Sequence, residues 1–352
     1  MGKLAVYKYF SFMFLVITVM MSIFTLFGLF GGYANPSREI AMGLIVLLLP
    51  FFIFGNVLTL VFWLIRRRWI WLAIPLITIL CCIPFIGTFY QPSILSSTSS
   101  RQSDFKIASY NVALFGREIT GFRADDILSE MKDQKVNILC LQEFMEQSGD
   151  RDNTASYMNH FTHSAKGRND MVIFSMFPIK ASGIIDFGAT NNSGMWADVE
   201  VRSRLVRIFN VHLETTGFNR TLSHVAKQSQ QQSSPLSRSI ILNAVYGNFT
   251  RGMAVRAGQA DIVARHISES PYPVVLCGDF NDVPYSYTYR TMKGQLVDGF
   301  TECGSGFMYT LRGGKKVRID YIFHDEAFHG VDYYKKSLSY SDHDPVFMSI
   351  AF

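Results

Sequence analysis

The stretch Val274–Pro284, which reads VVLCGDFNDVP, decides how the larger part of this chain is interpreted. Its first four residues are apolar and begin with two β-branched valines, which predicts a buried strand. Gly278 lets the chain turn tightly, and an extended backbone aims Asp279 and Asn281, two residues apart, to the same side. A carboxylate beside an amide suits a site where the acid accepts a proton from water or holds a metal, while the amide orients the water or a phosphoryl oxygen. The same residues also suit an ordinary Asx turn, so this stretch alone leaves both interpretations open.

Polar residues of similar chemistry end or flank five further segments that we predict as strands. These residues are Asn111 in SYNV, Glu143 in LCLQE, Asn210 and His212 in NVHLE, Asp320 in VRIDYIF, and Asp342 and His343 in YSDHDPV. Each is ordinary alone, because a lone histidine is usually structural and an acid at a strand end is usually solvated. Only their combination predicts a reaction site.

Together these side chains supply what hydrolysis of a phosphate ester needs. Glu143 and Asp342 are hard oxygen ligands of the kind that magnesium or calcium takes, and an ion with so few protein ligands would keep several waters. His212 and His343 can donate hydrogen bonds to a phosphoryl group or protonate a leaving oxygen, and Asp320 can fix the tautomer of a histidine. No serine, cysteine or lysine lies in a nucleophile motif, and no GxxxxGK loop is present. Attack by an activated water is therefore the simplest mechanism.

In this order and spacing, SYNV, LCLQE, NVHL, GDFND, IDYIF and SDHDPV resemble the endonuclease/exonuclease/phosphatase superfamily, which has the deoxyribonuclease-I-like fold. The resemblance covers about residues 104–352. It implies a four-layered α-β-β-α sandwich with a divalent metal at one end of two packed sheets. Mg²⁺ is the expected ion, with Mn²⁺ or Ca²⁺ as alternatives.

The resemblance also implies which residues hold the metal and the substrate. Asn111 and Glu143 would hold metal and phosphate, with Glu143 as the principal ligand, and Asp342 would contribute at the metal. Asn210, on the strand that carries NVHL, is expected to contact the substrate. Arg168, Asn169 and Asp170 fall where members often place a substrate-contacting residue ahead of a strand, although GRNDMVIFS departs from any single subfamily. Of these three, Asn169 is expected to bind the substrate.

Five residues receive catalytic roles from the same resemblance. His212 would lie near the leaving group or the phosphate. Asp279 would prepare the attacking water, and Asn281 would bind the phosphate and position that water. Asp320 would orient His343, which contacts the phosphate.

The first 92 residues have a different texture. Three uncharged segments contain apolar runs long enough to cross a bilayer, and we predict helices at about 9–31, 40–65 and 69–90, kinked at Pro50, Pro75 and Pro84. Lysines precede the first helix, and the triplet Arg66–Arg68 separates the second from the third. The positive-inside rule then predicts an integral, multi-pass membrane protein whose catalytic domain lies on the non-cytoplasmic side, periplasmic or extracellular.

The rest of the chain reads as a short linker and one α/β domain. Residues 93–103 are polar and serine-rich, which is typical of a flexible tether. From 104 onward we predict strands at 105–112, 137–142, 171–174, 196–201, 206–213, 274–277, 318–323 and 346–351, and helices at 124–135 and 253–267. The glutamine-rich segment 220–250 is expected to be a surface loop or, alternatively, a lid, with a short amphipathic helix at 240–249.

Charge and tether length bear on the substrate. Beyond residue 92 basic and acidic residues are equal in number, so the net charge of +5 belongs to the apolar part. A protein that grips duplex DNA usually needs an excess of Lys and Arg on one face. A tether of this length reaches only about 20 Å, which keeps the site near lipid head groups.

We therefore expect a membrane-anchored phosphoesterase acting on a phospholipid or sphingolipid head group, as a phosphodiester or phosphomonoester. The expected partners are the bilayer and this substrate, and no obligate protein partner is inferred. A metal-dependent nuclease acting on extracytoplasmic nucleic acid remains an alternative, and so does a non-catalytic binding module.

Overall fold

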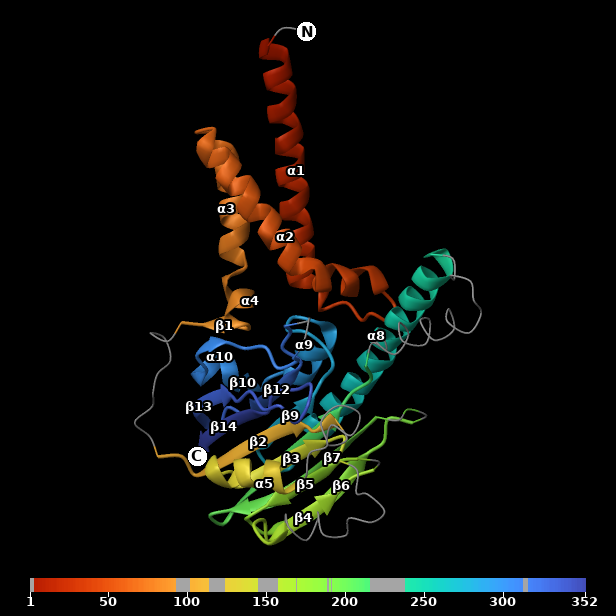
Figure 1. Cartoon of the computed structure of the whole chain (residues 1–352), viewed down its shortest axis with the longest axis vertical. Coiled ribbons are helices and arrows are strands. Elements are labelled where there is room, and N and C mark those ends of the chain that lie inside the picture. Colours follow the sequence, from red (N-terminus) through yellow and green to blue (C-terminus); the bar gives the residue numbers. More distant parts are fainter. Residues whose placement is uncertain are drawn as a thin grey trace.

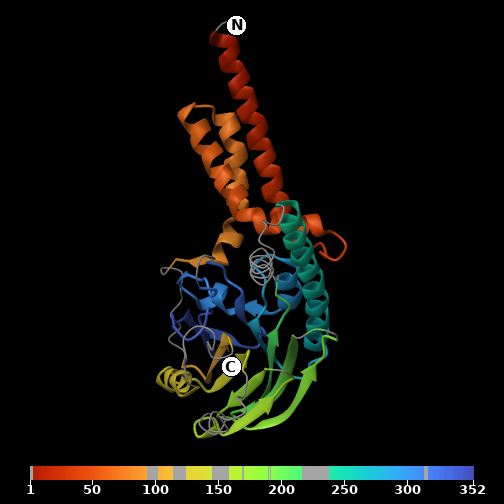
Figure 2. The same cartoon turned by 45° about the vertical axis from the view of Figure 1, so that its right-hand side comes forward.

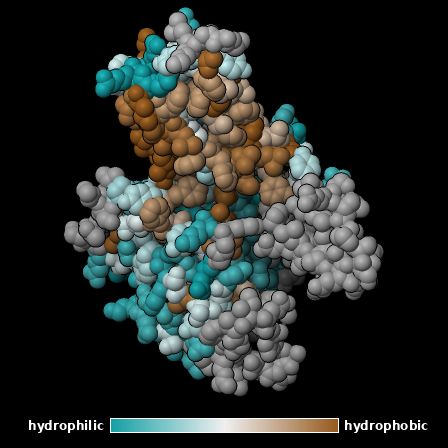
Figure 3. All heavy atoms as spheres, turned by 45° about the horizontal axis from the view of Figure 1, so that its top comes forward, coloured by the Kyte–Doolittle hydropathy of each residue, from teal (hydrophilic) through white to brown (hydrophobic). Residues whose placement is uncertain are grey.

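The computed structural model describes residues 3–92, 102–113, 124–144, 158–168, 170–188, 190, 192–215, 238–312 and 316–352. Within these residues an apolar bundle of helices stands on one side of a layered α/β unit (Figure 1). The bundle contains α1 (Lys3–Gly31), α2 (Ile40–Ile65), α3 (Trp69–Cys81) and α4 (Ile83–Gly87). Three spans in it, Val6–Gly31, Ile40–Ile65 and Trp69–Gly87, are long and apolar enough to cross a membrane. Figure 3 shows their hydrophobic surface above the hydrophilic surface of the α/β unit.

Proline interrupts the third of these spans. The sequence predicted one helix at about 69–90, whereas α3 ends at Cys81 and α4 begins at Ile83. Pro84 lies in the first turn of α4, and because it lacks an amide hydrogen it cannot continue the hydrogen-bond ladder of α3. The break redirects the chain just before it reaches the α/β unit.

Buried polar contacts fix α1 against α2. Asn56 Nδ2 donates to Thr25 Oγ1 at 2.7 Å, and Ser22 Oγ donates to Asn56 Oδ1 at 2.9 Å. Further along α2, Trp63 Nε1 donates to Thr18 Oγ1 of α1 at 2.8 Å. Asn56, Thr18 and Thr25 also bond to backbone carbonyls of their own helices, and the contacts between the helices specify how they pack. The helix ends therefore present a defined surface to the rest of the protein.

Two six-stranded sheets build the α/β unit. The first has the order β13-β14-β2-β3-β5-β4, and the second has the order β10-β12-β9-β8-β7-β6. The strands of the first sheet are β2 (Phe105–Asn111), β3 (Ile138–Gln142), β4 (His163–Lys166), β5 (Val172–Ser175), β13 (His329–Lys335) and β14 (Val346–Ala351). Those of the second are β6 (Ile179–Ile185), β7 (Ser193–Val201), β8 (Arg204–His212), β9 (Val274–Asp279), β10 (Val297–Asp298) and β12 (Asp320–His324).

Helices cover the outer faces of both sheets, while the inner faces pack on each other. Ile107 and Ile138 of the first sheet share one buried cluster with Ile208 and Cys277 of the second. The outer face of the first sheet is covered by α5 (Ala124–Asp133), and that of the second by α8 (Arg238–Ser268) and α9 (Tyr287–Lys293) (Figure 2). The result is the predicted α-β-β-α sandwich. The short helix α10 (Gly299–Cys303) follows β10.

The short helix predicted at 240–249 within the segment 220–250 is present, but it is part of a longer helix. Residues 238–250 are helical and continue without a break into the predicted helix, so that α8 has 31 residues. Residues 216–237 lie outside the described part of the chain.

Gly278 serves a purpose other than the predicted turn. Strand β9 continues through Gly278 to Asp279, and Gly278 has a φ of 140°. A Cβ atom at this position would lie 1.9 Å from the carbonyl oxygen of Val211 in β8. Glycine is therefore required for the close approach of two parallel strands, and the chain turns only at Asn281, where φ is 51°.

Candidate active site

Strand register brings three of the predicted residues side by side. In the second sheet β9 lies between β8 and β12, with His212 and Asp320 each paired with Asp279. Residues in register on neighbouring strands project from the same face of a sheet. The histidine and the two carboxylates therefore line one edge of the sandwich.

The first sheet contributes Asn111 and Glu143 at the carboxyl ends of parallel strands β2 and β3. Asn111 is paired with Gln142, and Glu143 follows with a positive φ of 54°. Asn111 Nδ2 lies 3.2 Å from Glu143 Oε1 and 3.0 Å from Asp279 Oδ2. One amide thus joins carboxylates from both sheets. Because its Oδ1 accepts from the backbone of Ala113, direct metal ligation by Asn111 would require the amide to turn.

His343 completes the cluster from the segment that precedes β14. Its Nδ1 lies 3.0 Å from Asp320 Oδ2, and its Nε2 lies 3.8 Å from Asp279 Oδ2. Ser341 fixes this segment by donating to the carbonyl of Asn111 at 2.7 Å and accepting from the His343 amide at 3.0 Å. Burial opposes protonation of His343, but the charges of Asp320 and Asp279 outweigh it and raise the pKa of the imidazole to about 10. At neutral pH His343 is therefore an imidazolium.

Asp279 and Asn281 form a compact pair after β9. The Asn281 amide donates to Asp279 Oδ1 at 2.8 Å, and Asn281 Nδ2 donates to the carbonyl of Leu213 at 2.9 Å. Burial raises the pKa of Asp279, and the nearby His343 works against that rise. A carboxylate with a raised pKa is a stronger base once it is ionised, which suits removal of a proton from water.

His212 and Asp170 lie on the other side of Glu143. His212 Nε2 is 3.7 Å from Glu143 Oε1 and 3.9 Å from Asp279 Oδ2. Burial raises the pKa of Asp170, whose carboxyl interacts with both His212 and Glu143. Asp170 thus belongs to the site, in the segment Arg168–Asp170 from which the sequence analysis chose Asn169 as the substrate-binding residue. Asn169 lies outside the described residues.

Two further predicted residues occupy different places. Asn210 is fully buried, and its Nδ2 donates to the carbonyls of Leu141 and Val172 at 3.0 and 3.1 Å. Its Oδ1 accepts from Gln142 Nε2 at 2.6 Å, so the amide ties the two sheets together, and this placement supports a structural role in place of substrate contact. Asp342 is exposed beside Ser341, at the rim of the cluster.

Sequence reasoning missed a pair of supports in α8. Arg256 Nε donates to Asp282 Oδ2 at 3.0 Å, and its Nη1 donates to the carbonyl of Glu214 at 2.8 Å. Gln259, one turn further, accepts from the Glu214 amide at 2.7 Å. These two side chains hold the loops that follow β8 and β9. The spacing of three residues on one helix face is the only sequence signal for them, because their partners are identified only by the fold.

The donor set fits a hard divalent ion. Asp279, Asp320 and His343 place one ligand atom each within 4.8 Å of one another, but these residues are buried and His343 Nδ1 is held by Asp320. Glu143 instead offers a carboxylate that is 30% exposed, with space for the waters that Mg²⁺ keeps. The carboxylates of Asp279 and Asp320 face the imidazole of His343, and those of Glu143 and Asp170 lie nearby, so a cation would also balance their charge. We therefore favour Glu143 over the buried triad as the residue that holds an ion.

Residues 108–343 match the model of the Endonuclease/Exonuclease/phosphatase family. The chain belongs to this family. Its members are metal-dependent hydrolases of phosphoric esters, and the chain is an enzyme of this class. Residues 11–89, which contain most of the helical bundle, match a domain of unknown function (DUF8431).

Solved structures share the fold of the family part. A humanized TDP2 of D. rerio has 17% sequence identity and a TM-score of 0.53, and the match covers 70% of this chain and 99% of that one. Family members from Bacteroides vulgatus and Bacteroides thetaiotaomicron have 16% and 19% identity and TM-scores of 0.53 and 0.51. Each of these two matches covers 70% of this chain, and they cover 98% and 97% of the two bacterial chains. No curated protein sequence matches this chain significantly.

Replacement of Asp320 by asparagine should destabilise the protein in a pH-dependent way. The raised pKa of His343 means that its pairing stabilises the fold fully below the pKa of an unfolded histidine, and that this stability is lost as pH rises toward about 10. Breaking the buried pair should lower the free energy of unfolding by about 3 kcal/mol at pH 6 and by clearly less at pH 10. Denaturant unfolding at both pH values measures the difference.

Asp186→Asn, which removes the carboxylate of an exposed ion pair with Arg168, is the control and should shift stability by less than about 0.5 kcal/mol at either pH. Equal losses for Asp320→Asn at both pH values would show that His343 is not held as an imidazolium.

Proposed function

We propose that this enzyme is anchored in a membrane by residues 1–92 and hydrolyses a phosphodiester or phosphomonoester in a phospholipid or sphingolipid head group. In this proposal residues 93–103 form a linker, and residues 104–352 form the catalytic domain, on the non-cytoplasmic side of the membrane. Magnesium is the preferred ion. One observation carries the lipid assignment: the loop that follows Asp279 and Asn281 packs directly on the ends of the apolar helices.

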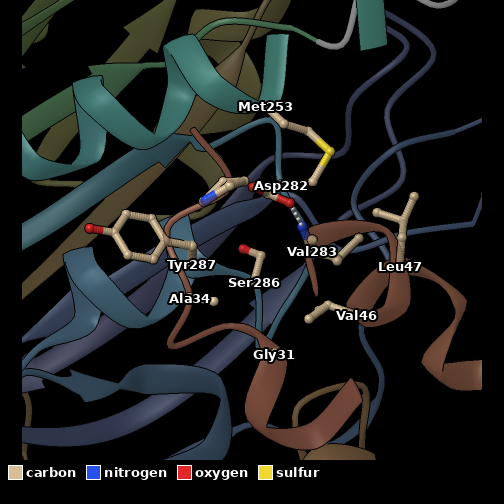
Figure 4. A pocket seen from close by; sticks show the side chains of 11 residues that line it. Gly31, Ala34, Val46, Leu47, Met253, Asp282, Val283, Ser286 and Tyr287 are labelled. Atoms are coloured by element: carbon tan, nitrogen blue, oxygen red, sulfur yellow. Dashed lines mark hydrogen bonds between the residues drawn. The ribbon is translucent and has the colours of Figure 1, made fainter. Parts of the chain in front are cut away.

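Tyr285 is the centre of that contact. It packs against the buried cluster formed by Leu29, Leu49, Cys82 and Phe85, with its ring 5.3 Å from that of Phe85. Asp282 and Ser286 of the same loop line a narrow crevice together with Gly31 and Ala34 at the end of α1 (Figure 4). Asp282 is the next residue after Asn281. A bilayer around the helices would therefore bring its head groups close to the reaction site.

The side chains of the site have distinct roles in this reaction. Asp279 is placed to accept a proton from the attacking water, and Asn281 is placed to orient that water or a phosphoryl oxygen. The imidazolium of His343 can donate from Nε2 to a phosphoryl oxygen, since Asp320 occupies Nδ1. His212 lies where it can protonate the leaving oxygen. A divalent ion, when bound, would neutralise charge on the phosphoryl group.

A substrate panel tests the proposal. Full-length protein in detergent micelles, with Mg²⁺, is assayed for release of phosphate or phosphorylated head group from sphingomyelin, phosphatidylcholine and phosphatidylinositol phosphates, and for cleavage of single- and double-stranded DNA. We expect at least one lipid to be hydrolysed and the DNA substrates to be left intact. Asp279→Asn protein serves as the control for contaminating activity. Turnover of DNA alone would overturn the lipid assignment and favour the nuclease, while no turnover of any phosphoester would favour a binding module.

A further inference from the structure

Arg290 joins the catalytic part of the protein to the end of α1. It lies in α9, and its Nη2 donates to the carbonyl oxygen of Leu29 at 2.7 Å. Leu29 belongs to the last turn of α1, where carbonyl groups lack partners within the helix and carry the negative end of the helix dipole. The guanidinium therefore caps α1 from outside the bundle.

The same guanidinium lies between two aromatic rings. Its Cζ atom is 4.2 Å from the ring centroid of Tyr33 and 4.3 Å from that of Tyr285. Tyr33 follows α1, whereas Tyr285 belongs to the catalytic loop, so the cation holds one ring from each part. Such contacts between a cation and the face of an aromatic ring are favourable.

The backbone of Tyr285 is in a conformation that needs this support. Its φ is 67°, which side chains other than glycine rarely adopt. Gly32 lies so close that a Cβ atom there would be 1.8 Å from the carbonyl oxygen of Tyr285. Arg290 Nε also lies 3.4 Å from that carbonyl oxygen. The helix end thus holds an unfavourable backbone conformation in place.

A short path leads from Tyr285 to the reacting groups. Three residues separate it from Asn281, and among them Asp282 is fixed by Arg256 on one side and by the hydroxyl of Tyr321, which donates to its carbonyl at 2.8 Å, on the other. Asn281 in turn donates its amide to Asp279 at 2.8 Å. Because the segment is short, a shift of Tyr285 would strain these contacts of Asp282 and displace Asn281 relative to the carboxylate that prepares the water.

We propose that Arg290 is a positioning residue for the reaction: by fixing Tyr285 to the end of α1, it makes the position of Asn281 depend on how the membrane helices are seated. The helical bundle is then part of the catalytic structure as well as an anchor. The effect of Arg290 on the reaction rests on the proposed phosphoesterase function, whereas its role in fixing Tyr285 to the end of α1 does not.

Arg290 is a better position for the test than Arg318, another arginine, which contacts the C-cap of α4. Arg318 Nη1 donates to the carbonyl of Thr88 at 3.1 Å, but this side chain is fully buried and paired with the equally buried Asp298. Its removal would leave a buried charge alone and would be expected to unfold the protein. The partners of Arg290 in the described part of the chain are carbonyl groups and rings, so its removal leaves no buried carboxylate without a partner.

The experiment compares Arg290→Gln, Arg290→Lys and the control Lys293→Gln, which alters a cation in the same helix. Full-length proteins in detergent are studied by amide hydrogen exchange of residues 281–287, and by kcat and KM for the soluble diester bis(p-nitrophenyl) phosphate with Mg²⁺. For Arg290→Gln we expect exchange faster by about tenfold. We also expect kcat to fall by roughly 10- to 100-fold while KM stays within about twofold, because the loss is one of geometry and not of binding. Arg290→Lys keeps the cation and should recover most of kcat, and Lys293→Gln should match the wild type.

Two results would overturn the inference. One is wild-type exchange and kcat in Arg290→Gln. The other is a loss of kcat in Arg290→Gln with unchanged exchange of residues 281–287, which would mean that Arg290 acts by another route. If the wild type does not hydrolyse the diester or any lipid, the proposed function fails, and the exchange comparison still decides whether Arg290 couples the helix to the loop.

Discussion

Asp279→Asn is expected to lower kcat by about a thousandfold while the protein stays folded. Asparagine has nearly the shape of aspartate and can keep a hydrogen bond with the Asn281 amide, but it cannot accept a proton from water. Asp279 also contacts polar side chains from both sheets, since Asn111, His212 and His343 all lie within 3.9 Å of its Oδ2. Initial rates on the substrate identified by the panel, or on a soluble diester, measure the effect.

The matched control for this prediction is Glu200→Gln. Glu200 pairs with Lys180 near the opposite end of β7 from Ser193, the residue that is paired with His212. It carries the same change of charge on the same sheet without touching the site, so its kcat should stay within about twofold of wild type. A rate for Asp279→Asn within tenfold of wild type would show that another group activates the water.

The convergence of the candidate residues could be predicted because strand ends follow a simple rule. Parallel neighbours bring their carboxyl ends to one edge, so His212 and Asp279 had to be close once β8 and β9 were adjacent. The antiparallel strand β12 enters at the same edge with Asp320. The rule does not say how deeply a side chain is buried between the sheets. For this reason Asn210, two residues before His212, was expected at the substrate but lies between the sheets.

The strands at the edges of the sheets were not predicted from the sequence. β4 and β13 end the first sheet, and β6 ends the second. An edge strand is covered on fewer sides, so its residues need not alternate between apolar and polar; β6, for example, is largely exposed along its middle. The central strands are buried along most of their length and were all found from their apolar runs.

The seating of the helices on the catalytic part could not be read from the sequence. Leu29 and Arg290 are 261 residues apart, and nothing local marks either as a contact residue. The predicted tether suggested only that the site stays near the membrane. In the structure β1 (Tyr90–Gln91) already pairs with β11 (Gly306–Phe307), so the chain meets the catalytic part before residues 93–103 begin.

Glu143→Gln is expected to raise the Mg²⁺ concentration needed for half-maximal activity by at least about a hundredfold. A neutral amide oxygen is a weaker ligand than a carboxylate, and Glu143 lies 3.2 Å from Asn111 with its carboxylate partly exposed. Chelation of the wild type should abolish activity, and added Mg²⁺ should restore it. Activity is measured against free Mg²⁺ for chelator-treated wild type, Glu143→Gln and the control Glu200→Gln, with Mn²⁺ binding followed by calorimetry.

The same titration separates the two placements of the ion that the geometry allows. An ion held by Glu143 leaves Asp320 free to orient His343, so Asp320→Asn should lower kcat without changing the metal dependence. An ion held by the triad of Asp279, Asp320 and His343 would reverse the pattern, with a shifted metal dependence in Asp320→Asn and none in Glu143→Gln. We expect the first pattern because Asp320 holds Nδ1 of His343 at 3.0 Å, and because an oxygen-preferring ion keeps its waters more easily at the partly exposed carboxylate of Glu143.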